Sequence, residues 1–146
     1  MYDDEQFTGK YKFYNQCQYI IKTLMSDPSS FYFFKPVEPE QDGAPEYFNY
    51  ITSPMCFYII QEKLSNKQYE IPEEFIADVQ LIWHNAKYYN GETNHVYQAA
   101  EKLRKQFEQL SLTLPRTILP DEKTSILQLY TELRLKRYKQ NKITHL

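Results

Sequence analysis

Glycine, cysteine and long apolar runs are scarce or missing in this sequence. Its 146 residues include three glycines and two cysteines. The glycines form no pattern that could cradle a phosphate, and the cysteines form no CxxC pair. No apolar stretch approaches the length of a transmembrane helix. These absences argue against a nucleotide-binding loop, a redox motif and a membrane span.

A large excess of charge of one sign is missing as well. The formal net charge is −2, which argues against a nucleic-acid-binding surface as the main function. Residues 1–5 are acidic and lack the apolar run of a secretory signal. We therefore expect a soluble intracellular protein without membrane contact, in which Cys17 and Cys56 are reduced thiols in apolar positions of helices.

The sequence also shows no cluster of metal ligands and no pair of acids placed for acid–base catalysis. The histidines, His84, His95 and His145, are not spaced like metal ligands with respect to each other or to cysteine. The acids Glu73 and Glu74 stand at the start of a predicted helix, a position that favours carboxylates for electrostatic reasons. We expect no enzymatic activity, no metal and no cofactor.

Aromatic residues, in contrast, are abundant. They make up 16% of the chain, mostly as tyrosine and phenylalanine, and together with so few glycines they indicate a helical protein rich in amphipathic ring surface. Apolar residues at helical spacing predict helices over residues 11–27, 54–64, 72–89 and 95–110. Ser53 and Asn94 are the expected N-caps of the second and fourth of these helices. The predicted fold class is all-α.

A fifth helix is predicted from residue 121 onward. Its narrower apolar stripe consists of Ile126, Leu129, Tyr130 and Leu133. Residues 134–142 are rich in lysine and arginine, which is typical of a solvated helix C-terminus. A nuclear-import signal is the alternative for this basic run.

A long connection, residues 29–53, joins the first two helices. It has no sustained period, and non-periodic loops of this length in a small helical domain are usually functional. It opens with four aromatics at residues 31–34 and closes with three more at residues 47–50, with acidic side chains between the two groups. A loop with so much ring surface is expected to pack against the bundle.

The junction between the third and fourth helices combines an amide with two tyrosines, over residues 85–91. Asn90 followed by Gly91 predicts a helix that ends through a left-handed residue. An asparagine side chain has two N–H donors and one acceptor, so it can orient a neutral amide group in an otherwise apolar hole. From these residues alone, a plain helix cap remains the alternative for Asn90.

Several segments, taken in order, resemble the bromodomain, the acetyl-lysine-binding module. They read FYFFKPV at residues 31–37, PEYFNYITSPM at 45–55, IQEKL at 60–64, FIAD at 75–78 and NAKYYN at 85–90. The resemblance runs from about residue 11 to about residue 110. It implies a left-handed four-helix bundle whose first long loop folds over one end. A bromodomain over residues 1–114 and a C-terminal helical extension over residues 115–146 follow from it.

The resemblance also implies roles for individual side chains. Asn90 would donate a hydrogen bond to the acetyl carbonyl, and Tyr47 would reach the same oxygen through an ordered water. Phe33 and Val37 would surround the acetyl methyl, and Val96 would stand at the rim as the so-called gatekeeper. The other positions assigned to the pocket are Tyr89, which forms a wall, Pro36, and the shelf residues Phe31 and Tyr32.

The shelf departs from the family pattern. The family commonly carries Trp-Pro-Phe where this chain has Phe31-Tyr32-Phe33, so the floor phenylalanine is kept while an indole and a proline are lost. Residues that flank an acetyl-lysine are therefore expected to bind this shelf differently.

We expect a non-catalytic nuclear reader of N-acetyl-lysine in protein tails, above all acetylated histone tails, that acts in transcription regulation as a monomer. Physical chemistry agrees, since placing a charged lysine in an aromatic hole without a counter-ion costs several kcal/mol, and acetylation removes that charge. One alternative is an interaction scaffold with a vestigial pocket whose C-terminal helix binds a protein of a chromatin complex. Another is a reader of a non-histone acetylated protein.

Overall fold

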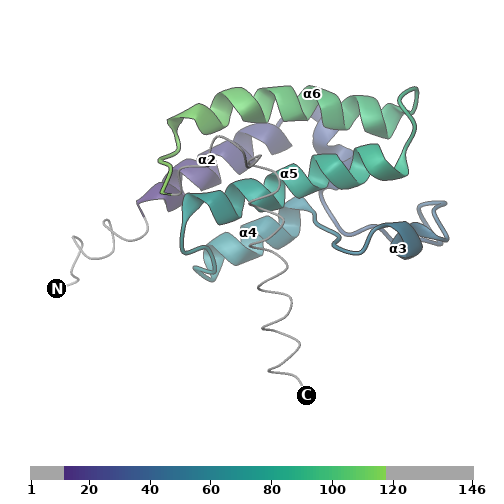
Figure 1. Ribbon diagram of the computed structural model, residues 1–146, viewed down its shortest axis with the longest axis horizontal. Helices are drawn as coiled ribbons and strands as arrows, with labels where there is room; N and C mark the ends of the chain where they lie inside the picture. Colours follow the sequence, from purple (N-terminus) through teal and green to yellow (C-terminus); the bar gives the residue numbers. More distant parts are fainter. Residues whose placement is uncertain (1–11, 118–146) are drawn as a thin grey trace, which may run out of the picture.

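The computed structural model describes residues 12–117, and these residues form helices joined by loops, with no strand among them (Figure 1). The prediction of an all-α helical bundle is confirmed. The main helices are α2 (Phe13–Met25), α4 (Phe57–Ser65), α5 (Pro72–Tyr89) and α6 (His95–Leu110), and the short elements are η1 (Pro28–Phe33), α3 (Tyr47–Tyr50) and η2 (Ser111–Thr113). The fifth helix and the basic run lie outside the described residues.

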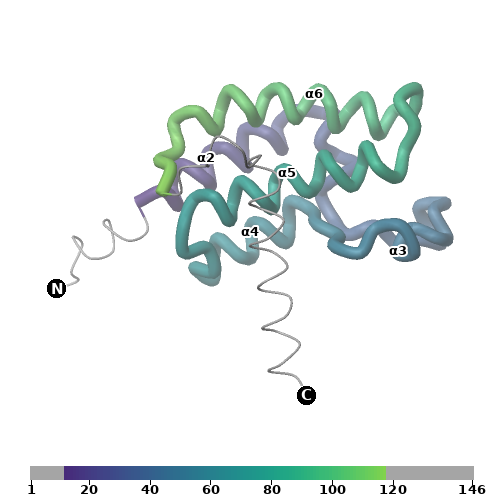
Figure 2. Tube along the Cα trace, viewed as in Figure 1, coloured from purple at the N-terminus to yellow at the C-terminus, as the bar shows by residue number. Residues whose placement is uncertain are grey.

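The four main helices bury the apolar stripes that the sequence predicts. Helix α5 packs against α6 and α4, while α2 packs against α4 and α6 (Figure 2). Near the middle of the core, the Trp83 ring lies edge-on to Phe33 and Phe57, with centroid distances of 5.8 and 5.9 Å. Each large side chain buried in this way contributes about 1.5–3 kcal/mol of apolar transfer free energy.

Helix α4 begins at Phe57, so the prediction of a start at Pro54 with Ser53 as N-cap is wrong. Tertiary contacts hold the preceding residues in the loop. The Ser53 carbonyl accepts a hydrogen bond of 2.8 Å from the Asn85 side chain on α5, and the backbone N–H of Tyr58 donates to the carbonyl of Phe34 at 3.0 Å. The loop therefore runs across α5 before α4 can start.

The end of α5 also differs from its prediction. Asn90 follows Tyr89 as predicted, but its backbone is extended (φ −107°, ψ 143°) rather than left-handed. Its own side chain and backbone N–H groups both donate to the Ala86 carbonyl, at 2.8 and 3.1 Å. The Ala86 carbonyl thus accepts both the last regular i→i−4 bond of the helix and the side-chain amide of Asn90, and α5 ends without a left-handed residue.

The left-handed non-glycine residue of the described chain is Lys67, with φ of 55°, just after α4. The Gln68 N–H donates to the Lys63 carbonyl at 2.9 Å and the Lys67 N–H to the Leu64 carbonyl at 3.2 Å. These two bonds form a Schellman motif, which ends a helix by reversing the chain. A lysine in this role could not be recognised from sequence, because glycine or asparagine is the usual residue there.

The long loop contains short helical turns and specific hydrogen bonds, although its sequence has no sustained period. At its start, the Asp27 side chain accepts hydrogen bonds from the Ser29 N–H (2.8 Å) and from Gln106 on α6 (2.7 Å). Tyr47 and Ile51 are buried near its end, which confirms that the loop packs down. The short helical turns η1 and α3 within it were not predicted.

Both cysteines are free and buried, as expected. Burial raises the pKa of the Cys17 thiol and of the Cys56 thiol, so both are poor nucleophiles. Cys56 lies just before α4 rather than within it. None of the helices between residues 12 and 117 has both the length and the apolar character of a membrane span.

Candidate functional site

The long loop and the α5–α6 junction meet at one end of the bundle (Figure 1). A small apolar cluster forms there, separate from the main core, and we call it the loop cluster. The Tyr47 ring on α3 lies edge-on to the Tyr89 ring at the end of α5, with centroids 5.0 Å apart. The members of the loop cluster are Val37, Ala44, Tyr47, Ile51 and Tyr89.

Tyr47 is held by this packing and is only 8% exposed. Burial, and secondarily the neighbouring Tyr89, raises the pKa of its hydroxyl. The phenol therefore stays protonated throughout the physiological range and can both donate and accept a hydrogen bond. A neutral hydroxyl of this kind suits a water molecule or another neutral partner.

Asn90 lies directly after Tyr89 and is half-buried. One N–H of its amide donates to the Ala86 carbonyl at 2.8 Å, which fixes the side chain relative to α5. The other N–H and the amide oxygen make no further hydrogen bond within the described part of the chain. The sequence left open whether Asn90 is a cap or a ligand-binding group. The capping bond uses one of the two amide donors, so the second N–H stays available.

Asn94, the second asparagine of the junction, has a different task. Its side-chain oxygen accepts the Val96 N–H at 2.7 Å and caps α6, so the prediction for this residue is confirmed. The cap fixes Val96 in the first turn of α6, where its half-buried side chain packs against the main core.

Phe33 belongs to the main core rather than to the loop cluster. It is the last residue of η1, is 7% exposed and packs on Trp83. The structure therefore divides the predicted pocket residues between two packing units. Val37, Tyr47 and Tyr89 are in the loop cluster, while Phe33 and Val96 are attached to the core.

The remaining predicted residues are at the surface. Phe31 and Tyr32 are 71% and 49% exposed, and their rings lie 6.4 Å apart, centroid to centroid. Pro36 is exposed as well. Accessible rings beside a binding site can contact residues that flank a ligand, as expected of a shelf.

The loop cluster contains no charged side chain. The acids of the loop, Glu38, Glu40, Asp42 and Glu46, are all exposed. One of them is structural, because the Asp42 carboxylate accepts the Glu38 N–H at 2.8 Å and closes a turn. The carboxylates of the loop therefore lie at the surface and not within the loop cluster.

Sequence reasoning missed the residues that support this end of the bundle. Asn85, 6% exposed, ties the loop to α5 through the Ser53 carbonyl. Ala44 and Ile51 are buried in the loop cluster together with Tyr47. A polar residue on the buried face of a predicted helix was the available signal for Asn85.

The described residues combine a helical bundle with a ring-lined apolar cluster and an Asn90 amide that uses one of its two donors. The model of the bromodomain family matches residues 17–102. The chain therefore belongs to the bromodomain family, a family of reader modules that are generally not enzymes.

Its relatives include two proteins named as transcription factors and one named for its bromodomain. Transcription factor GTE11 of Arabidopsis thaliana is 40% identical over 93 residues, which is 64% of this chain and 15% of the relative. Transcription factor GTE9 of the same plant is 39% identical over 103 residues, 70% of this chain and 15% of the relative. Bromodomain-containing factor 2 of Saccharomyces cerevisiae is 33% identical over 99 residues, 66% of this chain and 16% of that protein. The chain thus corresponds to a small part of each relative.

Proposed function

We propose that this protein binds N-acetyl-lysine in protein tails, foremost acetylated histone tails, and acts in transcription regulation in the nucleus. The observation that carries the proposal is the Asn90 amide. One donor anchors it to the Ala86 carbonyl, and the second remains for a ligand, next to a cluster without charge. Two relatives are named as transcription factors, which supports a role in transcription regulation.

The chemistry of the site favours an acetylated lysine over a free one. A free ammonium group would lose its hydration beside neutral rings and find no carboxylate among the loop-cluster side chains, at a cost of several kcal/mol. Acetylation removes the charge and adds a methyl group and an amide. The acetyl carbonyl then accepts the spare N–H of Asn90, and the Tyr47 hydroxyl holds a water that bridges to the same oxygen.

The remaining contacts in this proposal are apolar. Phe33 and Val37 enclose the acetyl methyl, Tyr89 and Pro36 flank the lysine stem, and Val96 limits the opening. Burial of about 100 Å² of ligand surface contributes on the order of 2–3 kcal/mol, and the hydrogen bond to Asn90 adds about 1 kcal/mol net. Ordering the peptide costs several kcal/mol. We therefore expect dissociation constants between roughly micromolar and millimolar.

The division of the chain is part of the proposal. Residues 1–114 form the bromodomain and residues 115–146 a C-terminal extension. A monomer with acetylated tail peptides as its partners is the expected form. An interaction scaffold with a vestigial pocket predicts a partner bound through the extension and no response to acetylation, so the peptide experiment below separates the two.

The test compares two asparagines of the same junction. Asn90→Ala should weaken binding of acetylated histone-tail peptides by about tenfold or more, because it removes the amide donor. Asn94→Ala removes the α6 cap next to Val96 and should lower the free energy of unfolding by about 1 kcal/mol, while its loss of affinity should be smaller than that of Asn90→Ala because the amide donor is kept. Calorimetric titration with acetylated and unmodified peptides measures the first effect, and urea unfolding measures the second. Unchanged affinity in the Asn90 variant would refute the proposed site.

A further inference from the structure

A row of aromatic rings crosses the surface from η1 to the start of α4, and we call it the ring row. Its members are Phe31, Phe34 and Tyr58, with centroid distances of 6.1 Å from Phe31 to Phe34 and 5.9 Å from Phe34 to Tyr58. Phe31 and Tyr58 are 71% and 49% exposed, while Phe34 is half-buried and packs against the main core. Phe31 belongs to the predicted shelf, but the proposed acetyl-lysine site does not account for Phe34 and Tyr58.

Main-chain hydrogen bonds hold the ring row together as well. The N–H of Tyr58 donates to the Phe34 carbonyl at 3.0 Å, which joins the start of α4 to the end of η1. The N–H of Phe34 donates to the Phe31 carbonyl at 3.4 Å. All three rings therefore stand on backbone that is already ordered. A surface of this kind loses little conformational freedom when a partner binds.

The ring row continues outward from the proposed acetyl-lysine site. Phe33 of that site has the Tyr32 ring at 6.2 Å, and Tyr32 has the Phe31 ring at 6.4 Å, centroid to centroid. From Phe31 the two steps of the row cover at most about 12 Å, which is the length of three or four residues of extended chain. A peptide whose acetyl-lysine occupies the site can therefore place a nearby residue on the row.

An acidic side chain accompanies the outer end of the row. Glu62 follows Tyr58 by four residues within α4, so the two side chains lie on the same face of this helix. Glu62 is exposed, and its carboxylate forms no ion pair within residues 12–117. Lys35, the base next to Phe34 in the chain, neither pairs with a carboxylate nor lies over a ring in the same range. The row thus combines ring surface with a carboxylate that has no cation in the described chain.

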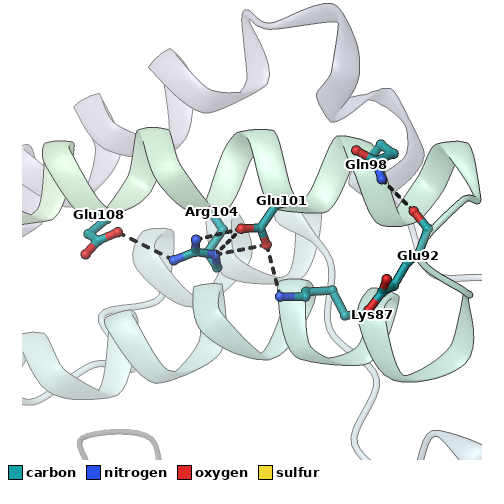
Figure 3. Close-up of polar contacts among 6 residues, drawn as sticks. All are labelled: Lys87, Glu92, Gln98, Glu101, Arg104 and Glu108. Atoms are coloured by element: carbon teal, nitrogen blue, oxygen red, sulfur yellow. Dashed lines mark hydrogen bonds and ion pairs between the residues drawn. The ribbon is translucent and has the colours of Figure 1, made fainter.

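The acids between α5 and α6 are used differently. Glu101 pairs with Lys87 at 3.0 Å and with Arg104 at 2.6 Å, and Glu108 pairs with Arg104 at 3.5 Å (Figure 3). A cation from a partner would have to compete with these ion pairs. At Glu62 it meets a carboxylate without first displacing a cation of the described chain.

We propose that the ring row and Glu62 bind an arginine side chain of the protein tail whose acetyl-lysine occupies the Asn90 site. This arginine is two to four residues from the acetyl-lysine. Its guanidinium group stacks on the rings of Phe34 and Tyr58 and donates to the Glu62 carboxylate. Arginine suits the row better than lysine, because its planar and weakly hydrated group stacks on aromatic faces and presents paired donors to a carboxylate. The inference rests on the proposed function, since the acetyl-lysine brings the arginine to the row.

The test measures whether the arginine and Glu62 act together. Each peptide carries one acetyl-lysine and one arginine, placed one to four residues away on either side, and citrulline replaces the arginine in the matched neutral peptide. At the best position, the original protein should bind the arginine peptide about fivefold more tightly, from an exposed cation–π contact and an exposed ion pair. Glu62→Gln and Tyr58→Ala should each reduce this ratio to about twofold. The control Glu70→Gln, which changes an exposed acid outside the row, should leave the ratio unchanged.

Free N-acetyl-lysine separates this inference from the proposed function. Followed by magnetic resonance titration, it should bind equally to the original protein, Glu62→Gln and Tyr58→Ala, which also shows that both variants are folded. A fivefold ratio that persists in both variants would overturn the role of the ring row. Tighter binding of a peptide with leucine in place of the arginine would assign the row to an apolar side chain and refute the arginine contact. If neither free N-acetyl-lysine nor any acetylated peptide binds, the Asn90 site is refuted and this inference with it.

Discussion

The two ends of the bundle use polar groups in opposite ways. At the end where α4 joins α5, the Tyr14 hydroxyl donates to the Tyr69 carbonyl at 2.6 Å and accepts the Tyr69 N–H at 2.7 Å. The Tyr69 hydroxyl and the Lys63 ammonium both donate to Asp78, each at 2.6 Å. At the other end, rings pack in the loop cluster, and Asn90 keeps one donor without a partner in the described chain.

Under the proposed function, this difference separates residues that stabilise the fold from residues that bind the ligand. A buried polar network whose members are all paired stabilises a unique arrangement of the helices. A half-used amide beside neutral rings contributes little to stability and retains its capacity for a ligand. Substitutions at the first end should therefore alter unfolding, and substitutions at the second should alter binding.

The largest effect is expected from Asp78→Ala. This change leaves the Tyr69 hydroxyl and the Lys63 ammonium without their shared acceptor, and should lower the free energy of unfolding by about 3 kcal/mol. Affinity for acetylated peptide should stay within about twofold of the original, since Asp78 lies about 18 Å along α5 from Asn90. Urea unfolding and calorimetric titration measure the two quantities. A weakened affinity in a protein that remains folded would show that the two ends are coupled.

Acid should destabilise the protein by protonating carboxylates that the folded state holds ionised, those of Asp27 and Glu101. The hydrogen bond from Gln106, together with the Ser29 N–H and Lys102, lowers the pKa of Asp27 to about 2. Because the pKa in the folded state is below that of the unfolded chain, near 3.9, this stabilisation is complete above about pH 4 and is lost as the pH falls through 2. Its size is on the order of 2 kcal/mol.

The same reasoning applies to Glu101, whose pKa Arg104 and then Lys87 lower to about 2. Its side chain is 26% exposed, so its contribution to stability is expected to be smaller. Unfolding by urea between pH 5 and 2 should therefore show declining stability, with a shallower decline in Asp27→Asn. A variant whose curve parallels that of the original protein would argue against the role of Asp27.

Tyr47→Phe should give a smaller effect of the opposite kind to Asp78→Ala: affinity should fall while the free energy of unfolding stays nearly the same. The change removes only the hydroxyl, so the packing on Tyr89 persists and the free energy of unfolding should change by less than about 0.5 kcal/mol. If the hydroxyl holds a bridging water, affinity for acetylated peptide should fall by about 1 kcal/mol, or roughly fivefold. Unaltered affinity would remove Tyr47 from the proposed contacts and leave Asn90 as the polar anchor.

The parts of the molecule that could be predicted from sequence are those set by local pattern. The buried stripe of α5 and the Asn94 cap of α6 follow from helical periodicity and from side chains that bond within two residues. The start of α4 could not be predicted, because it depends on the contact between Asn85 and the Ser53 carbonyl. That contact joins residues distant in the sequence.

The candidate site illustrates the same limit. The sequence placed Asn90 at the end of α5, and its resemblance to a family suggested which rings surround it. Neither could show that the Asn90 amide uses one donor to bind the Ala86 carbonyl, or that Phe33 packs with the core while Tyr47 packs with the loop. These features depend on how the loop lies on the bundle, which is a tertiary property.

The smallest effect is expected at the shelf, from Phe31→Ala. Phe31 is 71% exposed, and its ring lies near those of Tyr32 and Phe34, with centroid distances of 6.4 and 6.1 Å. Its loss should change the free energy of unfolding by less than about 0.5 kcal/mol. Free N-acetyl-lysine should bind as before, because the shelf lies outside the polar anchor.

Longer acetylated peptides should distinguish Phe31→Ala from the original protein. If the exposed ring contacts the residues that flank an acetyl-lysine, Phe31→Ala should weaken their binding by about 0.5–1 kcal/mol, or roughly two- to fivefold. Competition between a peptide and free N-acetyl-lysine measures this ratio directly. A parallel loss for both ligands would place Phe31 inside the pocket, whereas no loss for either would leave the ring without a role in recognition. The proposed division between a core-supported pocket and a surface shelf predicts the unequal result.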